Sequence, residues 1–389
     1  MTILQSKPKP ERKPTPRRGF TLVEMMIVIM IIGILMAIAV PAVNRAMTTG
    51  KETAIRLEIN ALSQAVERYM QKYGDYPPDA SSWEVLERHM RRVFPRMSPQ
   101  DFSLLTQLTR QRGTPTFSYV AMDRAEALVF FLGGFSEDPL YPLTGEGGPL
   151  KLIRNPTGSD PALNLDNYEY NATRDNALFD FDVARLTVSR GANDNNPLLS
   201  TDETLLNVSD AVHGYTDPLP VYLARAGDPA PIVYFDSRTY GDLGSGAYNG
   251  YLAGAYPSQY GGVRPYKTQA VVEPPAGANY GSVKNALAAI PFHNRDTFQI
   301  ISPGLDGVFG AVLSDTPSST TGNYPAYFVT ETGQVMLPIE TATSPSGLLM
   351  TSPAITRFQD VDWVPQITVN GHLDNITNFS ESTLENGLQ

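Results

Sequence analysis

The longest apolar stretch of the chain runs from Phe20 to Val40 and contains 21 residues. Its only polar side chains are those of Thr21 and Glu24. At about 1.5 Å per residue, a helix of this length spans about 30 Å, the thickness of a bilayer core. The pattern therefore predicts a membrane-crossing helix that carries a carboxylate close to its beginning.

A second helical pattern follows this run. Apolar positions recur at intervals of 4, 3, 4, 3 and 4 residues, which places them on one helix face, and they are Ile55, Ile59, Leu62, Val66, Tyr69 and Tyr73. Gly74 follows as a stop signal. We therefore expect one long N-terminal helix whose second half packs on a globular body, with a helical dimer as the alternative. Pro41 and Gly50 are positions where such a helix is able to kink.

Three shorter helical patterns lie between residues 75 and 135. Each begins with a side chain able to cap a helix, followed by a residue typical of a first turn. The pairs are Ser81 with Glu84, Ser98 with Pro99, and Asp123 with Glu126. We therefore predict a helical subdomain over residues 75–135.

Short β-type runs mark the rest of the chain, residues 136–389. The clearest is PIVYFDSRTY at 231–240, and TFQIISPGLDGVFG at 297–310 and AYFVTETGQVMLP at 326–338 follow it. Long loops rich in glycine, proline, asparagine and tyrosine separate the runs. The order of elements predicts an α+β fold, with a β-rich globular region after the helices.

Composition and charge exclude several classes of functional site and partner. The chain has 389 residues and no cysteine, which excludes disulfides, thiol nucleophiles and cysteine-based metal sites. The first 19 residues have a charge balance of +5 and the remainder −15. A basic beginning is typical of a segment kept on the cytoplasmic side of a membrane. The acidic body disfavours general nucleic-acid binding, so no nucleic-acid partner is expected.

Two export signals compete with a permanent membrane helix. Ala37-Ile38-Ala39 offers an A-x-A-like cleavage site for a signal peptidase, and Arg17-Arg18 offers a twin-arginine motif. The apolar run is longer than the roughly 7–15 residues of a usual signal peptide. Neither signal gives a reason for Glu24.

The stretch RRGFTLVE, residues 17–24, resembles the processing site of type IV prepilins and type II secretion pseudopilins. In that family a dedicated peptidase cuts after the glycine, here Gly19, and the new N-terminal residue, here Phe20, is N-methylated. The family's glutamate after the cut corresponds to Glu24, and its helix proline to Pro41. The resemblance implies that Glu24 neutralises the Phe20 amine of a neighbouring subunit during assembly.

The resemblance also implies a fold, partners and a location. The fold would be pilin-like, with a long N-terminal helix on an antiparallel sheet, a helical insertion and long loops. Its parts would be a leader at 1–19, a transmembrane and assembly helix at 20–74, a helical subdomain at 75–135 and a β-rich region at 136–389. The partners would be prepilin peptidase and methyltransferase, other pilin or pseudopilin subunits, and an inner-membrane assembly platform. The chain would cross the bacterial inner membrane once, with a cytoplasmic N-terminus and a periplasmic body, before it enters a filament.

The stretch ISPGLDGVFG, residues 301–310, resembles a loop that holds calcium in major pseudopilins. Asp306 is the implied ligand and Asp315 a second one. Calcium takes six to eight oxygen ligands, and the further acidic residues of that loop are not visible downstream. An ordinary Asp-Gly turn is therefore the preferred interpretation, and calcium is the only cofactor that the sequence suggests.

No motif for catalysis is visible in the sequence. His293 lies three residues before Asp296, but no nucleophile completes a triad, and the other histidines are scattered at His89, His213 and His372. We therefore predict a structural filament subunit rather than an enzyme. A membrane-anchored or exported binding protein and an exported hydrolase are the alternatives. Secretion, adhesion, motility and DNA uptake all remain open as the setting.

Overall fold

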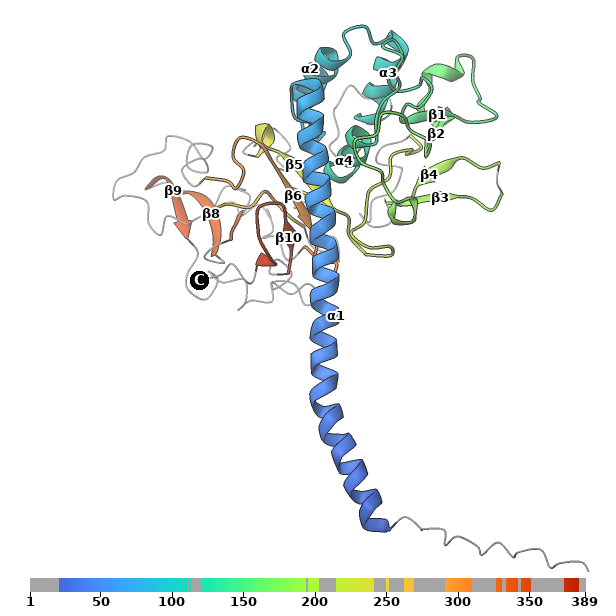
Figure 1. Ribbon diagram of the computed structural model, residues 1–389. Coiled ribbons are helices and arrows are strands. Elements are labelled where there is room, and N and C mark those ends of the chain that lie inside the picture. The colour runs from blue at the N-terminus through green and yellow to red at the C-terminus, as the bar shows by residue number, and fades with distance from the viewer. Residues whose placement is uncertain are drawn as a thin grey trace, which may run out of the picture. The chain divides into compact units, whose positions relative to one another are not determined.

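The computed structural model describes residues 21–110, 112, 121–193, 195–202, 215–240, 250–251, 262–268, 291–309, 327–330, 334–341, 344–350 and 374–384. The chain divides at Gly50 into two compact units, Met1–Gly50 and Lys51–Gln389. The elements of each unit are shown in Figure 1.

One helix, α1 (Leu22–Tyr73), begins in the first unit and ends in the second (Figure 1). It contains 52 residues and continues as a helix through Pro41 and Gly50. Its end is the predicted one: Gly74 has a φ of 74°, a conformation that glycine adopts without steric cost, and its N–H donates to the Met70 carbonyl at 2.7 Å.

The predicted apolar stripe of α1 is buried in the second unit. The first five members of the stripe are at most 1% exposed, and they are Ile55, Ile59, Leu62, Val66 and Tyr69. Ala65 is buried beside them. The stripe shares one apolar core with Phe130 and Phe131 of the fourth helix and with Tyr234 and Ile300 of the central sheet. Intramolecular packing on a globular body therefore accounts for the stripe, as the sequence predicted.

Three shorter helices follow: α2 (Trp83–Val93), α3 (Pro99–Leu108) and α4 (Arg124–Leu132). Ser98 caps α3 through a bond from the Asp101 N–H, as predicted. Asp123 and Glu126 form the predicted capping box of α4. The capping box predicted at Ser81 is wrong: Ser82 is the N-cap of α2, and the Ser81 hydroxyl donates instead to Asp79 Oδ1 at 2.6 Å.

The strands form small antiparallel sheets. The central sheet has the order β10-β6-β5, from β5 (Val233–Asp236), β6 (Phe298–Ser302) and β10 (Ile376–Thr377). A second sheet has the order β7-β8-β9, from β7 (Tyr327–Val329), β8 (Gln334–Thr341) and β9 (Ser344–Met350). The predicted strands at 231–240, 297–310 and 326–338 thus correspond to β5, β6 and the β7–β8 pair.

Two further strand pairs and four short 3₁₀ helices are also found among the described residues of the body. The pairs are β1 (Leu150–Leu152) with β2 (Tyr168–Tyr170), and β3 (Val188–Arg190) with β4 (Leu198–Ser200). The 3₁₀ helices are η1 (Pro161–Leu163), η2 (Leu165–Asn167), η3 (Val183–Arg185) and η4 (Ser237–Thr239). A long N-terminal helix followed by helices and antiparallel sheets confirms the predicted α+β, pilin-like class.

Asp79 ties the loop after α1 to α4 and to η4, which directly follows β5. Its Oδ2 accepts from Arg124 Nε at 3.0 Å and from the Thr239 hydroxyl at 2.7 Å. The Asp79 and Arg124 side chains are 1% and 5% exposed, so the ion pair is buried. Removing one partner of such a pair typically costs about 3–5 kcal/mol, because the other charge stays buried without compensation.

Two of the histidines lie in well-bonded positions. His89 shares a 2.8 Å hydrogen bond with the Tyr69 hydroxyl and a 3.3 Å one with Asp75. His293 bonds to the Thr330 hydroxyl at 2.7 Å and stacks on Phe379. These are the partners expected of structural histidines, while His213 and His372 lie outside the described residues.

His89 is expected to make the stability of the body sensitive to acid. Burial lowers the pKa of His89 to about 4, although the bond to Asp75 acts in the opposite direction. The unfolded chain therefore takes up a proton near its ordinary pKa of about 6.5, well before the folded chain does. Between these two pKa values, stability is expected to fall as the pH falls, by up to about 1.4 kcal/mol per pH unit.

Urea unfolding of the wild type and of His89→Gln, at pH 7 and at pH 4.5, measures this effect. Glutamine keeps hydrogen-bonding groups but does not titrate in this range. The wild type is expected to lose more stability than the variant between the two pH values. An equal loss in both proteins would show that His89 does not carry the acid sensitivity.

Candidate functional site

The beginning of α1 is closed by a reciprocal pair of side chains. Glu24 Oε2 accepts from the Thr21 N–H and from the Thr21 hydroxyl, both at 2.8 Å. Thr21 Oγ1 in turn accepts from the Glu24 N–H at 3.2 Å. This is a capping box, which satisfies two of the backbone donors that a helix beginning leaves without partners. It also places a negative charge in the first turn, where the helix dipole favours one.

The helix behind this cap presents an apolar surface. Large apolar side chains from Leu22 to Met47 are exposed, and they include Met26, Ile29, Met30, Leu35 and Ile38. Within the described residues, α1 is the one helix long and apolar enough to cross a membrane, with a mean hydropathy of 2.9 over its most apolar window. Pro41 lies inside it. Gly19 and Phe20, the predicted processing residues, lie outside the described residues.

A pair of carboxyl groups meets at the loop after β6: Asp306 belongs to this loop and Asp374 to the segment just before β10. Asp374 Oδ2 accepts from the backbone N–H of Leu305 at 2.8 Å and of Asp306 at 3.1 Å. Asp306 Oδ1 accepts from the Val308 N–H at 2.8 Å, which is the turn expected of an Asp-Gly sequence. Partial burial, and then the charge of Asp374, raise the pKa of Asp306 to about 7. Calcium binding at Asp306 stays a prediction, and Asp315 lies outside the described residues.

Sequence reasoning missed Asp374 because nothing local marks it. Asp374 follows Asp306 by 68 residues and reaches it because β10 pairs with β6, with Ile376 opposite Ser302. The capping role of Glu24 was also missed, although a signal was available. Thr-Leu-Val-Glu at 21–24 has the S/T-x-x-E spacing of a capping box directly before an apolar run.

The comparison with known protein families decides the nature of this N-terminal segment. Residues 15–40 match the prokaryotic N-terminal methylation motif. The chain carries this methylation motif. The match includes Gly19, Phe20 and Glu24, the residues on which the resemblance to prepilins was based.

Several curated proteins are similar to the chain around the methylation motif. The type II secretion system core protein G of Pseudomonas aeruginosa is 37% identical over 68 residues, 18% of this chain and 48% of that protein. A fimbrial protein of Neisseria meningitidis is 37% identical over 85 residues, 20% of this chain and 50% of that protein. The type IV major pilin protein PilE of Neisseria gonorrhoeae is 38% identical over 68 residues, 18% of this chain and 41% of that protein.

These likenesses cover a limited part of each protein. The chain spans half or less of the length of the curated relatives that it matches. None of the solved structures matches the chain significantly. The similarity therefore lies in the N-terminal part of the chain, and the large body has to be understood from its own residues.

Proposed function

We propose that the chain is a subunit of a pilus or of a type II secretion pseudopilus. The observation that carries the proposal is the methylation motif at residues 15–40, which overlaps the exposed apolar part of α1. Similarity to a pseudopilus-related protein and to two pilus proteins points the same way. In this proposal the role of the chain is assembly, and catalysis is not required.

Processing is the first step of the proposed mechanism. A prepilin peptidase cuts after Gly19 on the cytoplasmic face and releases a leader with a charge balance of +5. Phe20 then becomes the N-terminal residue and is methylated on its amine. A glycine before the cut suits this step, because a residue without a side chain lets its backbone approach an enzyme closely.

Assembly follows when α1 leaves the bilayer and packs with the same helix of other subunits. The Glu24 capping box uses Oε2, and among the described residues it leaves Oε1 for a further donor. The proposed donor is the Phe20 amine of a neighbouring subunit. Its bond to Glu24 would set the axial position of one subunit relative to the next. The inner-membrane assembly platform lifts the subunit, whose body lies on the periplasmic side before it enters the filament.

The proposal is tested by asking whether the chain enters filaments in its native cell. Filaments are sheared from the surface, purified by sedimentation and analysed for this chain by mass spectrometry. We expect the processed chain in the filament fraction, and we expect it to disappear from that fraction when the prepilin peptidase gene is deleted. A chain that stays in the membrane or the periplasm while filaments form normally would contradict the proposal and favour an anchored or exported binding protein.

A further inference from the structure

A pocket with basic walls lies where the β1–β2 pair meets the β3–β4 pair. Its volume is about 320 Å³. Three basic residues line it, Lys151, Arg154 and Arg190, together with Glu169 and Asn195. We call this cavity the basic pocket.

Strand pairing brings two of the basic side chains to one carboxylate. Lys151 of β1 lies opposite Glu169 of β2, so their side chains share a face of the sheet, and Lys151 Nζ is 3.0 Å from Glu169 Oε1. Glu169 Oε2 accepts from Arg190 Nη1 at 3.4 Å and from the Leu198 N–H of β4 at 2.9 Å. Glu169 is 6% exposed, and it therefore anchors both basic side chains to the framework of strands.

The segment between β3 and β4 holds the third basic side chain. Arg154 Nη1 donates to Asn195 Oδ1 at 2.7 Å. Arg190 Nη1 also donates to the next residue, at the Asn196 carbonyl, at 2.6 Å. The Lys151 and Arg190 side chains are still 60% and 35% exposed, so a ligand is able to reach them from solvent. Side chains that are already held lose less conformational freedom when a ligand binds.

The side-chain groups that the basic pocket leaves for a ligand are donors. Both oxygens of Glu169 already accept, and Asn195 Oδ1 accepts from Arg154. Among the described residues, Arg154 Nε, Arg154 Nη2 and Asn195 Nδ2 have no acceptor. The Lys151 ammonium has three N–H donors, and Glu169 does not use them all. A ligand that fits these groups has to supply acceptors.

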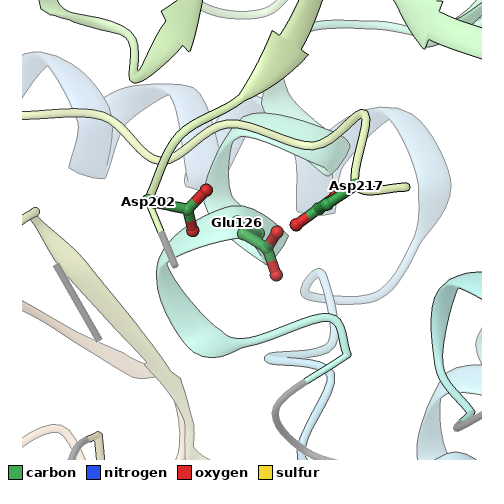
Figure 2. Close-up of side chains that lie close together, drawn as sticks. All are labelled: Glu126, Asp202 and Asp217. Carbon is green, nitrogen blue, oxygen red and sulfur yellow. The ribbon is translucent and has the colours of Figure 1, made fainter. Parts of the chain in front are cut away.

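The charge of the basic pocket contrasts with that of the body. The chain after residue 19 has a charge balance of −15. Carboxylates gather elsewhere in the body, as Glu126, Asp202 and Asp217 do, and none of these three lines the basic pocket (Figure 2). The described lining residues instead have a charge balance of +2. A phosphate monoester matches this balance, because it carries a charge of about −1.5 to −2 at neutral pH and three acceptor oxygens.

The volume of the pocket limits the size of the ligand. Liquid water takes about 30 Å³ per molecule, so about 320 Å³ has room for about ten non-hydrogen atoms. A phosphate group takes about half of them and leaves the rest for a small organic group. Leu152 and Pro197 also line the pocket and provide apolar contacts for such a group. Glycerol 3-phosphate, with about ten non-hydrogen atoms, is a probe of the right size.

We propose that the basic pocket binds the phosphate group of a small phosphate monoester. The Arg154 guanidinium, whose planar fork suits phosphate oxygens, and the Lys151 ammonium are the charged donors, and the Asn195 amide adds a neutral one. Glu169 holds Lys151 and Arg190 in place. The site uses neither the methylation motif nor α1, so it does not depend on the proposed filament function.

Titration calorimetry of the full-length protein tests the proposal. The protein is kept in a nonionic detergent and a phosphate-free buffer at neutral pH, with constant ionic strength because salt screens exposed charges. The probes are glycerol 3-phosphate, inorganic phosphate and glycerophosphoglycerol. The last is a phosphodiester with a single negative charge, like the headgroup of a lipid.

Two variants and one matched control go through the same titrations. Arg154→Gln and Lys151→Gln each remove one positive charge from the basic pocket. Arg88→Gln is the control, because Arg88 is exposed on α2 and has no ion-pair partner among the described residues. Circular dichroism shows whether each variant folds, and Lys151→Gln carries the comparison if Arg154→Gln does not fold.

We expect the wild type to bind glycerol 3-phosphate and inorganic phosphate at one site per chain, and the diester several-fold more weakly. Arg154→Gln is expected to weaken the binding of glycerol 3-phosphate by about tenfold, because a hydrogen bond between two charged groups is lost. Arg88→Gln is expected to bind like the wild type, since it changes the net charge of the body equally but leaves the basic pocket intact.

Four outcomes would overturn the proposal. The first is a wild type that binds neither glycerol 3-phosphate nor inorganic phosphate. The second is wild-type affinity in a folded Arg154→Gln and a folded Lys151→Gln. The third is an equal loss in Arg88→Gln, which would indicate general attraction of anions or a site on α2. The fourth is a diester that binds as tightly as the monoester, which would favour a lipid headgroup as the ligand.

Discussion

Glu24→Ala is expected to be produced, inserted and processed like the wild type, yet to be depleted at least about tenfold from sheared filaments. Truncating one partner of a buried charge pair leaves the other charge without compensation. Such a change strongly weakens an interface. Here the remaining charge is the Phe20 amine of the neighbouring subunit. Quantitative mass spectrometry of filament and membrane fractions measures the ratio.

Two further variants separate the charge of Glu24 from its capping role. Glu24→Gln keeps an oxygen that accepts from the Thr21 N–H and hydroxyl but removes the charge. Thr21→Ala removes the hydroxyl of the capping box and keeps the charge. We expect Glu24→Gln to fail in assembly like Glu24→Ala, and Thr21→Ala to assemble. Normal filaments from Glu24→Gln would mean that capping of α1, and not charge neutralisation, is the role of Glu24.

Gly19→Val is expected to block removal of the leader almost completely. A branched side chain at the cut prevents the close backbone approach that glycine allows. A barrier raised by about 2.7 kcal/mol already slows cleavage a hundredfold. The chain then keeps its first 19 residues, the Phe20 amine is never formed, and the protein stays in the membrane fraction. The length of the purified chain, read from its intact mass, measures this directly.

Gly33→Ala is the matched control for this change. Gly33 lies inside α1, and a Cβ added there meets no atom within 4 Å. This variant is expected to be processed as fast as the wild type. If Gly19→Val is processed at the same rate as Gly33→Ala, cleavage does not occur after Gly19.

The sequence predicted those features that depend on neighbouring residues. The stripe from Ile55 to Tyr69 has helical spacing, and α1 buries it. The cap at Ser98 was predicted from the adjacent Pro99 and the cap at Asp123 from Glu126 three positions on, and both form. The cap predicted at Ser81 was wrong, because the Ser81 hydroxyl donates to the carboxylate of Asp79, two residues earlier.

The sequence did not predict contacts between residues that lie far apart along the chain. Glu126 was predicted to cap its helix, which it does, but its approach to Asp202 and Asp217 depends on contacts between segments 76 and 91 residues apart in the sequence. Asp374 reaches the Asp306 loop only through the pairing of β10 with β6. Carboxylates are frequent in this chain, and spacing along the sequence gives no sign of which of them meet in space.

The N-terminal peptide mass of the protein purified from its native membrane tests the central claim most directly. A chain that begins at Phe20 and carries one additional methyl group on its amine is the result that the account predicts. A chain that begins at Val40 would mean release by a signal peptidase after Ala39, and a chain that keeps residues 1–19 would mean a plain membrane anchor. Either of these results would contradict the assignment to a pilus or pseudopilus.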